Sequence, residues 1–69
     1  MERQPVKSSN VKSIGHDPNS NTLEVEFKDG SVYQYAGVDA DKHQALINAK
    51  SIGSHFHQHI KSSHKFTKG

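Results

Sequence analysis

An alternation of apolar and polar side chains, followed at once by a turn dipeptide, constrains the fold more than any other feature. Residues 22–28 read Thr-Leu-Glu-Val-Glu-Phe-Lys, the period-two pattern of a strand with one buried face. Asp29-Gly30 follows, and residues 31–36 resume the alternation with two tyrosines. Because Asp-Gly favours a tight reversal of the chain, this segment predicts an antiparallel hairpin.

Two registers are open for this hairpin. A two-residue loop would place both tyrosines on the face that carries the glutamates. A three-residue loop with Gly30 in the left-handed conformation would instead pair Val25 with Tyr33 and Leu23 with Tyr35. We prefer the second register, because it gathers the large apolar side chains on one face and a one-residue slip would undo this.

The segments on either side of the hairpin carry weaker signals. Residues 6–14 are a strand candidate interrupted by polar side chains, and residues 16–21 are rich in turn formers. Asp39 is placed to cap a helix over residues 40–49. Residues 64–69 alternate around a single phenylalanine, which fits either a last edge strand or a frayed end.

A second helix is expected over residues 51–61, with Ser51 as its N-cap. Ile52, Phe56 and Ile60 follow at i, i+4 and i+8, which forms one apolar stripe. The predicted fold is therefore α+β: a small antiparallel sheet of about three strands, followed by two helices packed on one face. We expect a flexible leader over residues 1–5, a single domain over residues 6–67 and a tail at residues 68–69.

Composition limits the kind of protein this can be. The chain has 69 residues, of which 30% are hydrophobic, so its core is small and leaves little room for a deep, dry pocket. Cysteine is absent, which excludes disulfides and thiolate zinc sites. No apolar run is long enough to span a bilayer, and the first residues lack the apolar stretch of a signal peptide. We expect a cytoplasmic protein that is not an enzyme.

Charge is distributed unevenly along the chain. Residues 1–41 hold four basic residues and all seven acidic ones, whereas residues 42–69 hold five lysines and no acidic residue. Five of the six histidines also lie in the second segment. A basic half is typical of a protein that binds a polyanion such as RNA, although it also fits a solvated surface that aids solubility.

Nucleic-acid binding is the functional class with the most candidate residues. Basic side chains from the second helix into the tail could follow a phosphate backbone. Two tyrosines, together with Phe66, could stack on bases, unless the tyrosines belong to the core. The absence of arginine after residue 3 removes the residue that specific readers favour. The candidate nucleic-acid-binding residues are Lys50, His57, Lys61, His64, Lys65, Lys68, Tyr33 and Tyr35.

Other chemistries find little support. His55 and His59 lie one helical turn apart and could chelate a metal, but the helix supplies no further ligand, so we expect no metal site and no cofactor. The serines lack a nucleophile-elbow context. Glu24 and Glu26 are expected on the solvent face of a strand. We therefore expect no catalytic residues and no small-molecule substrate.

Three ordered segments carry a resemblance to a known family. Residues 6–15, Val-Lys-Ser-Ser-Asn-Val-Lys-Ser-Ile-Gly, resemble the opening of the KTSC domain. Its central portion is similar to residues 23–38, including the Tyr-x-Tyr pair, and its closing helix is similar to residues 49–60. His16, His55 and His64 stand where the family pattern usually has an aromatic residue, so a metal site or pH switch built from them would not be inherited.

The resemblance implies a domain that occurs at the C-terminus of some lysyl-tRNA synthetases and as small single-domain proteins of bacteria and phages. It implies RNA as the partner through the synthetase context. We therefore expect a small non-catalytic binding module for RNA. The alternative is a protein–protein interaction module, such as a phage or prophage accessory protein that engages a host protein.

Overall fold

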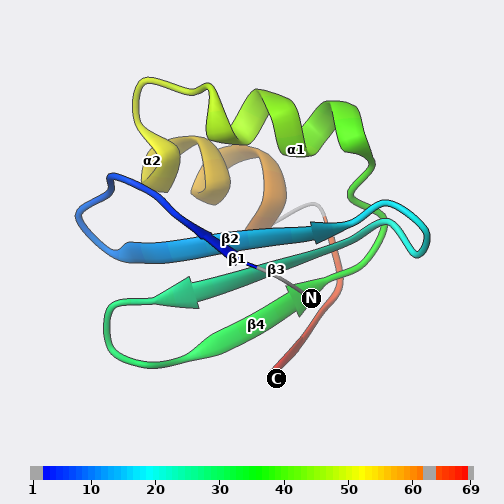
Figure 1. Ribbon diagram of the computed structural model, residues 1–69, viewed down its shortest axis with the longest axis horizontal. Coiled ribbons are helices and arrows are strands. Elements are labelled where there is room, and N and C mark those ends of the chain that lie inside the picture. Colours follow the sequence, from blue (N-terminus) through cyan, green and yellow to red (C-terminus); the bar gives the residue numbers. More distant parts are fainter. Residues whose placement is uncertain (1–2, 62–63, 69) are drawn as a thin grey trace.

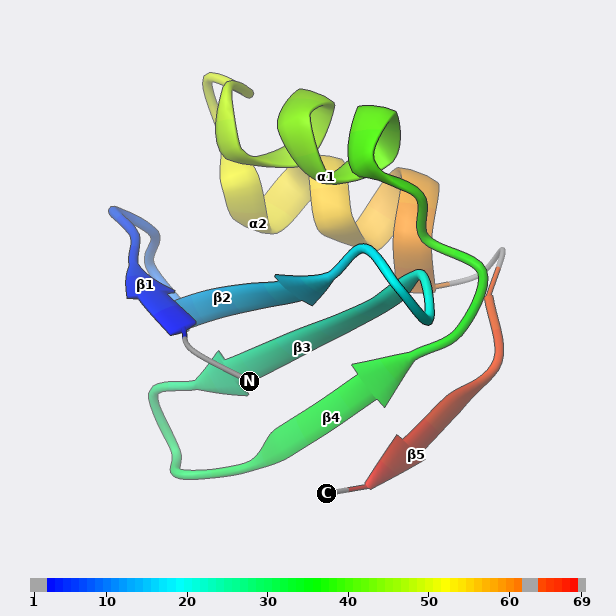
Figure 2. The same ribbon diagram turned by 45° about the vertical axis from the view of Figure 1, so that its right-hand side comes forward.

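Five antiparallel strands form one sheet in the order β1-β2-β3-β4-β5, of which Figure 1 labels the first four and Figure 2 also labels β5. The computed structural model describes residues 3–61 and 64–68. The five strands in the described part of the chain are β1 (Arg3–Pro5), β2 (Val11–Asp17), β3 (Thr22–Phe27), β4 (Val32–Tyr35) and β5 (Phe66–Lys68).

The helices follow β4 and lie together on one face of the sheet (Figures 1 and 2). They are α1 (Ala40–Ile47), α2 (Ile52–Phe56) and the π-helix η1 (His57–Lys61), which continues directly from α2. Both predicted N-caps are confirmed: the Asp39 carboxylate accepts from the Lys42 amide at 2.9 Å, and the Ser51 hydroxyl accepts from the Ser54 amide at 3.4 Å. None of the described helices is long and apolar enough to cross a membrane.

The α+β class, the antiparallel sheet and the two helical segments are confirmed, but the expected number of strands was wrong. The sheet has five strands rather than about three, because both edges carry a three-residue strand. Arg3–Pro5, expected in the leader, pairs with β2, and Lys68, expected in the tail, belongs to β5. Residues 1, 2 and 69 of the predicted leader and tail lie outside the described residues.

Strand β2 begins and ends later than the sequence indicates. It starts at Val11 and reaches Asp17, so His16 pairs with Leu23 where a loop was expected. A register shift between Val11 and Ser13 leaves Lys12 as an extra residue in the strand. Pairing with β3 extends the strand through His16 and Asp17, and the polar side chains of these residues give no local indication of a strand.

The predicted hairpin register is confirmed. Val25 lies opposite Tyr33 and Leu23 lies opposite Tyr35. Gly30 adopts a φ of +94°, the left-handed conformation that a three-residue loop requires and that glycine adopts at little cost. The large apolar side chains of both strands therefore share the face beneath the helices.

The core between sheet and helices contains the full apolar stripe of the second helical segment. Ile52, Phe56 and Ile60 are each at most 8% exposed. Phe27 and Tyr33 are partly buried at the margin of this core. The buried core residues are Val11, Ile14, Leu23, Val25, Tyr35, Val38, Leu46, Ile52, Phe56 and Ile60.

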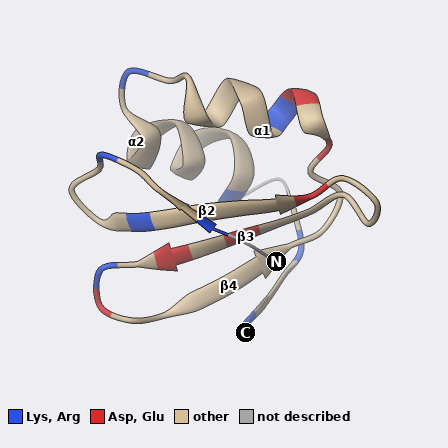
Figure 3. Cartoon of the chain, viewed as in Figure 1, with Lys and Arg blue, Asp and Glu red and all other residues tan. Residues whose placement is uncertain are grey.

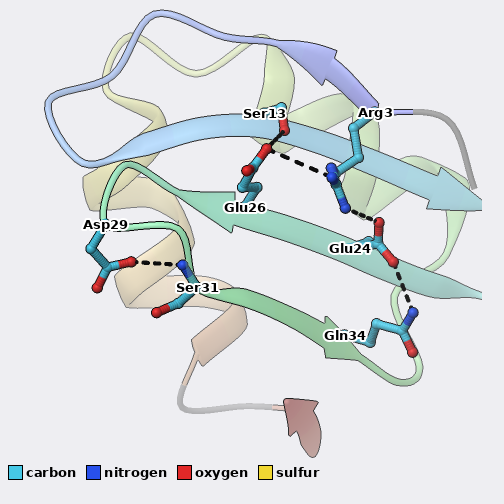
Figure 4. Close-up of polar contacts among 7 residues, drawn as sticks. All are labelled: Arg3, Ser13, Glu24, Glu26, Asp29, Ser31 and Gln34. Atoms are coloured by element: carbon cyan, nitrogen blue, oxygen red, sulfur yellow. Dashed lines mark hydrogen bonds and ion pairs between the residues drawn. The ribbon is translucent and has the colours of Figure 1, made fainter. Parts of the chain in front are cut away.

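The opposite face of the sheet carries a polar cluster rather than solvated carboxylates (Figure 4). Arg3 forms ion pairs with Glu24 and, at 3.7 Å, with Glu26. The Gln34 amide donates to Glu24 at 2.8 Å, and the Ser13 hydroxyl donates to Glu26 at 3.0 Å. Glu24 is only 8% exposed, so the expectation of a solvent-facing glutamate pair was wrong. These contacts hold β1 against the sheet.

Replacing Arg3 tests how much its ion pairs with Glu24 and Glu26 contribute to stability. The hydrogen bond from Gln34, followed by the bond and charge of Arg3, holds the pKa of Glu24 below its ordinary value. Arg3→Ala removes the cation from a nearly buried carboxylate, so we expect the free energy of unfolding to fall by about 1–2 kcal/mol. Urea denaturation near neutral pH measures the change. Lys12→Ala, which removes an exposed charge from β2, is the matched control, and equal stabilities of the two variants would contradict the prediction.

A stacked histidine pair joins α1 to the sheet. The rings of His16 and His43 lie 4.8 Å apart at an interplanar angle of 11°. The His16 Nε2 is 2.6 Å from the carbonyl oxygen of Val38, where the chain leaves the sheet. Burial, and to a smaller extent the charge of His16, lowers the pKa of His43 below 6.5. The folded protein therefore favours neutral His43.

Stability should consequently fall in mild acid. Below a pH of about 6.5 the unfolded chain binds a proton at His43 more readily than the folded chain does, so the free energy of unfolding decreases. We expect a lower thermal midpoint at about pH 5.5 than at about pH 7.5, and a smaller difference in His43→Phe, which keeps a stacked ring without titrating. His57→Gln is the control because His57 is exposed. An unchanged pH dependence in His43→Phe would refute this role.

Candidate functional site

All five aromatic residues of the chain gather in one cluster on the helix-covered face of β3, β4 and β5. Tyr33 meets Phe27 and Phe66 edge to face, with ring centroids 5.7 and 5.6 Å apart. Tyr35 packs against Phe56 at 5.1 Å and against Phe66 at 5.7 Å. The β4–β5 pairing creates this arrangement, because it sets Phe66 opposite Tyr35.

The cluster is open to solvent along one side. A groove of about 310 Å³, called the aromatic groove here, is lined by Asn10, Phe27, Tyr33, Tyr35, Lys61 and Phe66. Phe66 is 57% exposed, the largest exposed hydrophobic side chain in the described residues, whereas Tyr35 is 3% exposed. The groove therefore has a buried floor at Tyr35 and a largely exposed ring, Phe66, at its edge.

Two lysines flank these rings. Lys61, the last residue of η1, lines the groove, and Lys68 on β5 lies opposite Tyr33 in the sheet register. The pKa of Asp29 in the hairpin is lowered mainly by hydrogen bonds from Ser31 and, to a smaller extent, by the charge of Lys68. Lys68 therefore adds positive charge near the hairpin end of β4.

The tyrosine hydroxyls differ in their surroundings. Burial, and then the neighbouring Tyr33, raises the pKa of Tyr35 above its ordinary value of 10.0. Tyr35 therefore stays protonated near neutral pH and forms part of the floor. Tyr33 is half-buried, so part of its ring borders the accessible space.

The remaining predicted site residues lie elsewhere. Lys50 stands in the connection between α1 and α2, and His57 borders a hollow beside the β1–β2 loop. Lys65 borders a hollow that also includes Gln34 and Thr67, on the sheet face opposite the tyrosines. Lys and Arg are accordingly spread around the fold rather than gathered on one face (Figure 3). The basic half of the sequence does not form one continuous track.

His64 is held by backbone and side-chain contacts. Its Nδ1 lies 2.9 Å from the carbonyl oxygen of Ala36, and its Nε2 lies 3.4 Å from the Lys42 ammonium. A ring that donates from Nδ1 leaves Nε2 free to accept from Lys42. This ring ties the segment before β5 to the start of the helical layer.

The two helical histidines expected to be neighbours are indeed close. The rings of His55 and His59 have centroids 4.4 Å apart. Within residues 3–61 and 64–68, no group of three or more His, Cys, Asp or Glu side chains is arranged to hold a metal ion.

The structure brings together four of the eight predicted residues, namely Tyr33, Tyr35, Lys61 and Lys68. Sequence reasoning missed Asn10 as a groove residue, because nothing local indicates that the β1–β2 loop reaches the aromatic cluster. It also missed Phe27, because the position of this ring at the hairpin end of β3 points to the groove only once the register is known.

Comparison with known proteins places this arrangement in a family. A model of the KTSC domain matches residues 7–66. An uncharacterized protein of Stutzerimonas stutzeri is 44% identical over 64 residues, which cover 93% of this chain and 90% of that protein. A lysine–tRNA ligase of Nostoc sp. is 37% identical over 60 residues, which cover 87% of this chain but 11% of the ligase.

A solved structure agrees with the sequence matches. The crystal structure of a KTSC domain protein from Yersinia pestis superposes with a TM-score of 0.95 at 41% sequence identity, covering 99% of this chain and 96% of that one. The chain belongs to the KTSC domain family.

Proposed function

We propose that this KTSC domain is a non-catalytic binding module for RNA, which takes an unpaired base into the aromatic groove. The observation that carries the proposal is the groove itself, in which an exposed phenylalanine, a half-buried tyrosine and a lysine border one recess. Aromatic rings beside cations are the usual platform for single-stranded nucleic acid. Such a partner fits a cytoplasmic protein.

The geometry favours an unpaired base over a duplex. The recess has a volume of about 310 Å³, and rings from β3, β4 and β5 line it together with Lys61 at the end of η1. A base stacked inside a helix has no free face to offer these rings. A loop, bulge or end of a structured RNA does, and tRNA contains such regions. The similarity to a segment of lysine–tRNA ligases supports this choice.

Removing the two flanking lysines tests the phosphate contacts. Each phosphate contact on a single strand contributes about 0.7 to the slope of log affinity against log salt concentration, so Lys61→Ala with Lys68→Ala should reduce the slope by about 1.4. Binding to mixed tRNA, measured by fluorescence anisotropy over a salt series, gives this slope. Lys12→Ala with Lys50→Ala removes the same charge outside the groove and should leave the slope nearly unchanged.

Two results would refute the proposal. One is an absence of salt-sensitive RNA binding by the unaltered protein at micromolar concentration. The other is an equal loss of slope in the control, which would show that general charge rather than the groove is responsible.

Phe66 provides an independent test of stacking. Phe66→Leu keeps an apolar side chain at a position that is largely exposed, so the fold should be retained. It removes the flat ring, and loss of one base–aromatic contact is expected to weaken binding by about 1–3 kcal/mol, about 5- to 150-fold. Affinity for single-stranded RNA at fixed salt is the measurement. Unchanged affinity would show that the ring does not contact a base.

A protein partner is the competing function, and the exposure of Phe66 favours it, because a protruding ring beside an apolar recess also suits a protein interface. A phage or prophage accessory protein that engages a host protein would use such a surface. Capture of partners from a nuclease-treated lysate distinguishes the two functions. Loss of every partner after nuclease treatment speaks against the protein interface.

A further inference from the structure

A second recess adjoins the aromatic groove, and its chemistry is different. It is a hollow of about 390 Å³ between the β1–β2 loop and the α2–η1 segment, called the polar hollow here. Hydroxyl and amide side chains dominate its lining, and His57 is its one ionisable side chain. Its polar lining residues are Ser9, Asn10, Ser51, Ser54, His57 and Gln58.

Several of these groups are free to bind a ligand. Within the described part of the chain, the side chains of Ser9, Ser54 and Gln58 form no hydrogen bond with another residue, although Ser54 donates its backbone amide to Ser51. Asn10 accepts from the Ser8 hydroxyl at 3.3 Å through Oδ1, which leaves its amide NH₂ as a donor. The hollow therefore offers donors and acceptors together, and no lysine, arginine or carboxylate of the described residues lines it.

The loop side of the hollow is rigidly held. The Asn10 carbonyl accepts from the Lys28 amide at 2.9 Å, and Ser8 accepts from the amides of Asn10 and Val11 at 3.4 Å. A Cβ on Gly53 would lie only 2.8 Å from Asn10 Oδ1, so the loop rests directly on the helix backbone. The polar groups are thus positioned before a ligand arrives, which lowers the entropic cost of binding.

The two recesses meet at Asn10, which lines both. A nucleotide next to a base that stacks on the rings of the aromatic groove would therefore reach the hollow. Neutral donors and acceptors suit the hydroxyl groups of a sugar, whereas a phosphate is attracted to Lys61 in the aromatic groove. The 2′-hydroxyl of ribose both donates and accepts, and DNA lacks it.

We propose that the polar hollow binds the ribose of the nucleotide next to the base in the aromatic groove, and that it makes the chain select RNA over DNA. This inference rests on the proposed function. The groove supplies affinity for any single strand, because every base has a face to stack. The hollow supplies the discrimination between the two sugars.

The test compares a short oligouridylate with the oligodeoxyuridylate of the same length, since the two differ only at the 2′ position. One or two hydrogen bonds to the 2′-hydroxyl predict that the unaltered protein binds the RNA about tenfold more tightly. Ser54→Ala with Gln58→Ala should lower RNA affinity to that of DNA while DNA affinity stays the same. Lys61→Ala with Lys68→Ala should weaken both by a similar factor, and Gln44→Ala, at an exposed position on α1, should change neither.

The outcomes separate the two proposals. Equal affinity of the unaltered protein for both strands overturns the ribose subsite but leaves nucleic-acid binding intact. A preference for RNA that survives in the Ser54 and Gln58 variant also overturns the subsite. Absence of binding to either strand and to mixed tRNA overturns the proposed function and this inference with it.

Discussion

The pairing of β3 with β4 is the constraint on which the rest of the structure depends. In the observed register Val25 lies opposite Tyr33 and Glu24 lies opposite Gln34, so one face is apolar and the other carries the carboxylates. A shift of β4 by one residue would turn the tyrosines away from the helices and onto the face that carries the glutamates. The aromatic cluster on one face and the Arg3 cluster on the other thus have a single origin.

The aromatic groove also depends on contacts between segments that lie far apart in the sequence. Its lining comes from the β1–β2 loop, the hairpin, the end of η1 and β5, and the last of these reaches β4 only after both helical segments. His64 contributes to this arrangement by contacting the Ala36 carbonyl and the Lys42 ammonium immediately before β5 begins. A site assembled in this way exists only in the complete fold, and no short segment of the sequence contains it.

Local signals allowed much of the fold to be predicted. Asp29-Gly30, the two capping residues and the stripe from Ile52 to Ile60 each act within a few residues, and all are confirmed. The edge strand β1 was not predicted, and β5 was one of two alternatives for residues 64–69, since a strand that short has too few side chains to show a period. The basic track was expected because the lysines lie close together along the sequence. In the fold, the α2–η1 segment separates Lys50 from Lys61 by its full length. Half of the candidate residues therefore lie apart from the groove.

The aromatic rings differ in their exposed fraction, so the same cluster can contribute both to the core and to the candidate site. Phe56 and Tyr35 are each 3% exposed and belong to the core, whereas Phe66 in the same cluster is 57% exposed. A base that packs against Phe66 would bury apolar surface that the edge strand leaves in water, so it would also stabilise the pairing of β5 with β4. Under the proposed function, base binding and the docking of β5 would therefore be thermodynamically linked, and the groove would become most ordered when it is occupied.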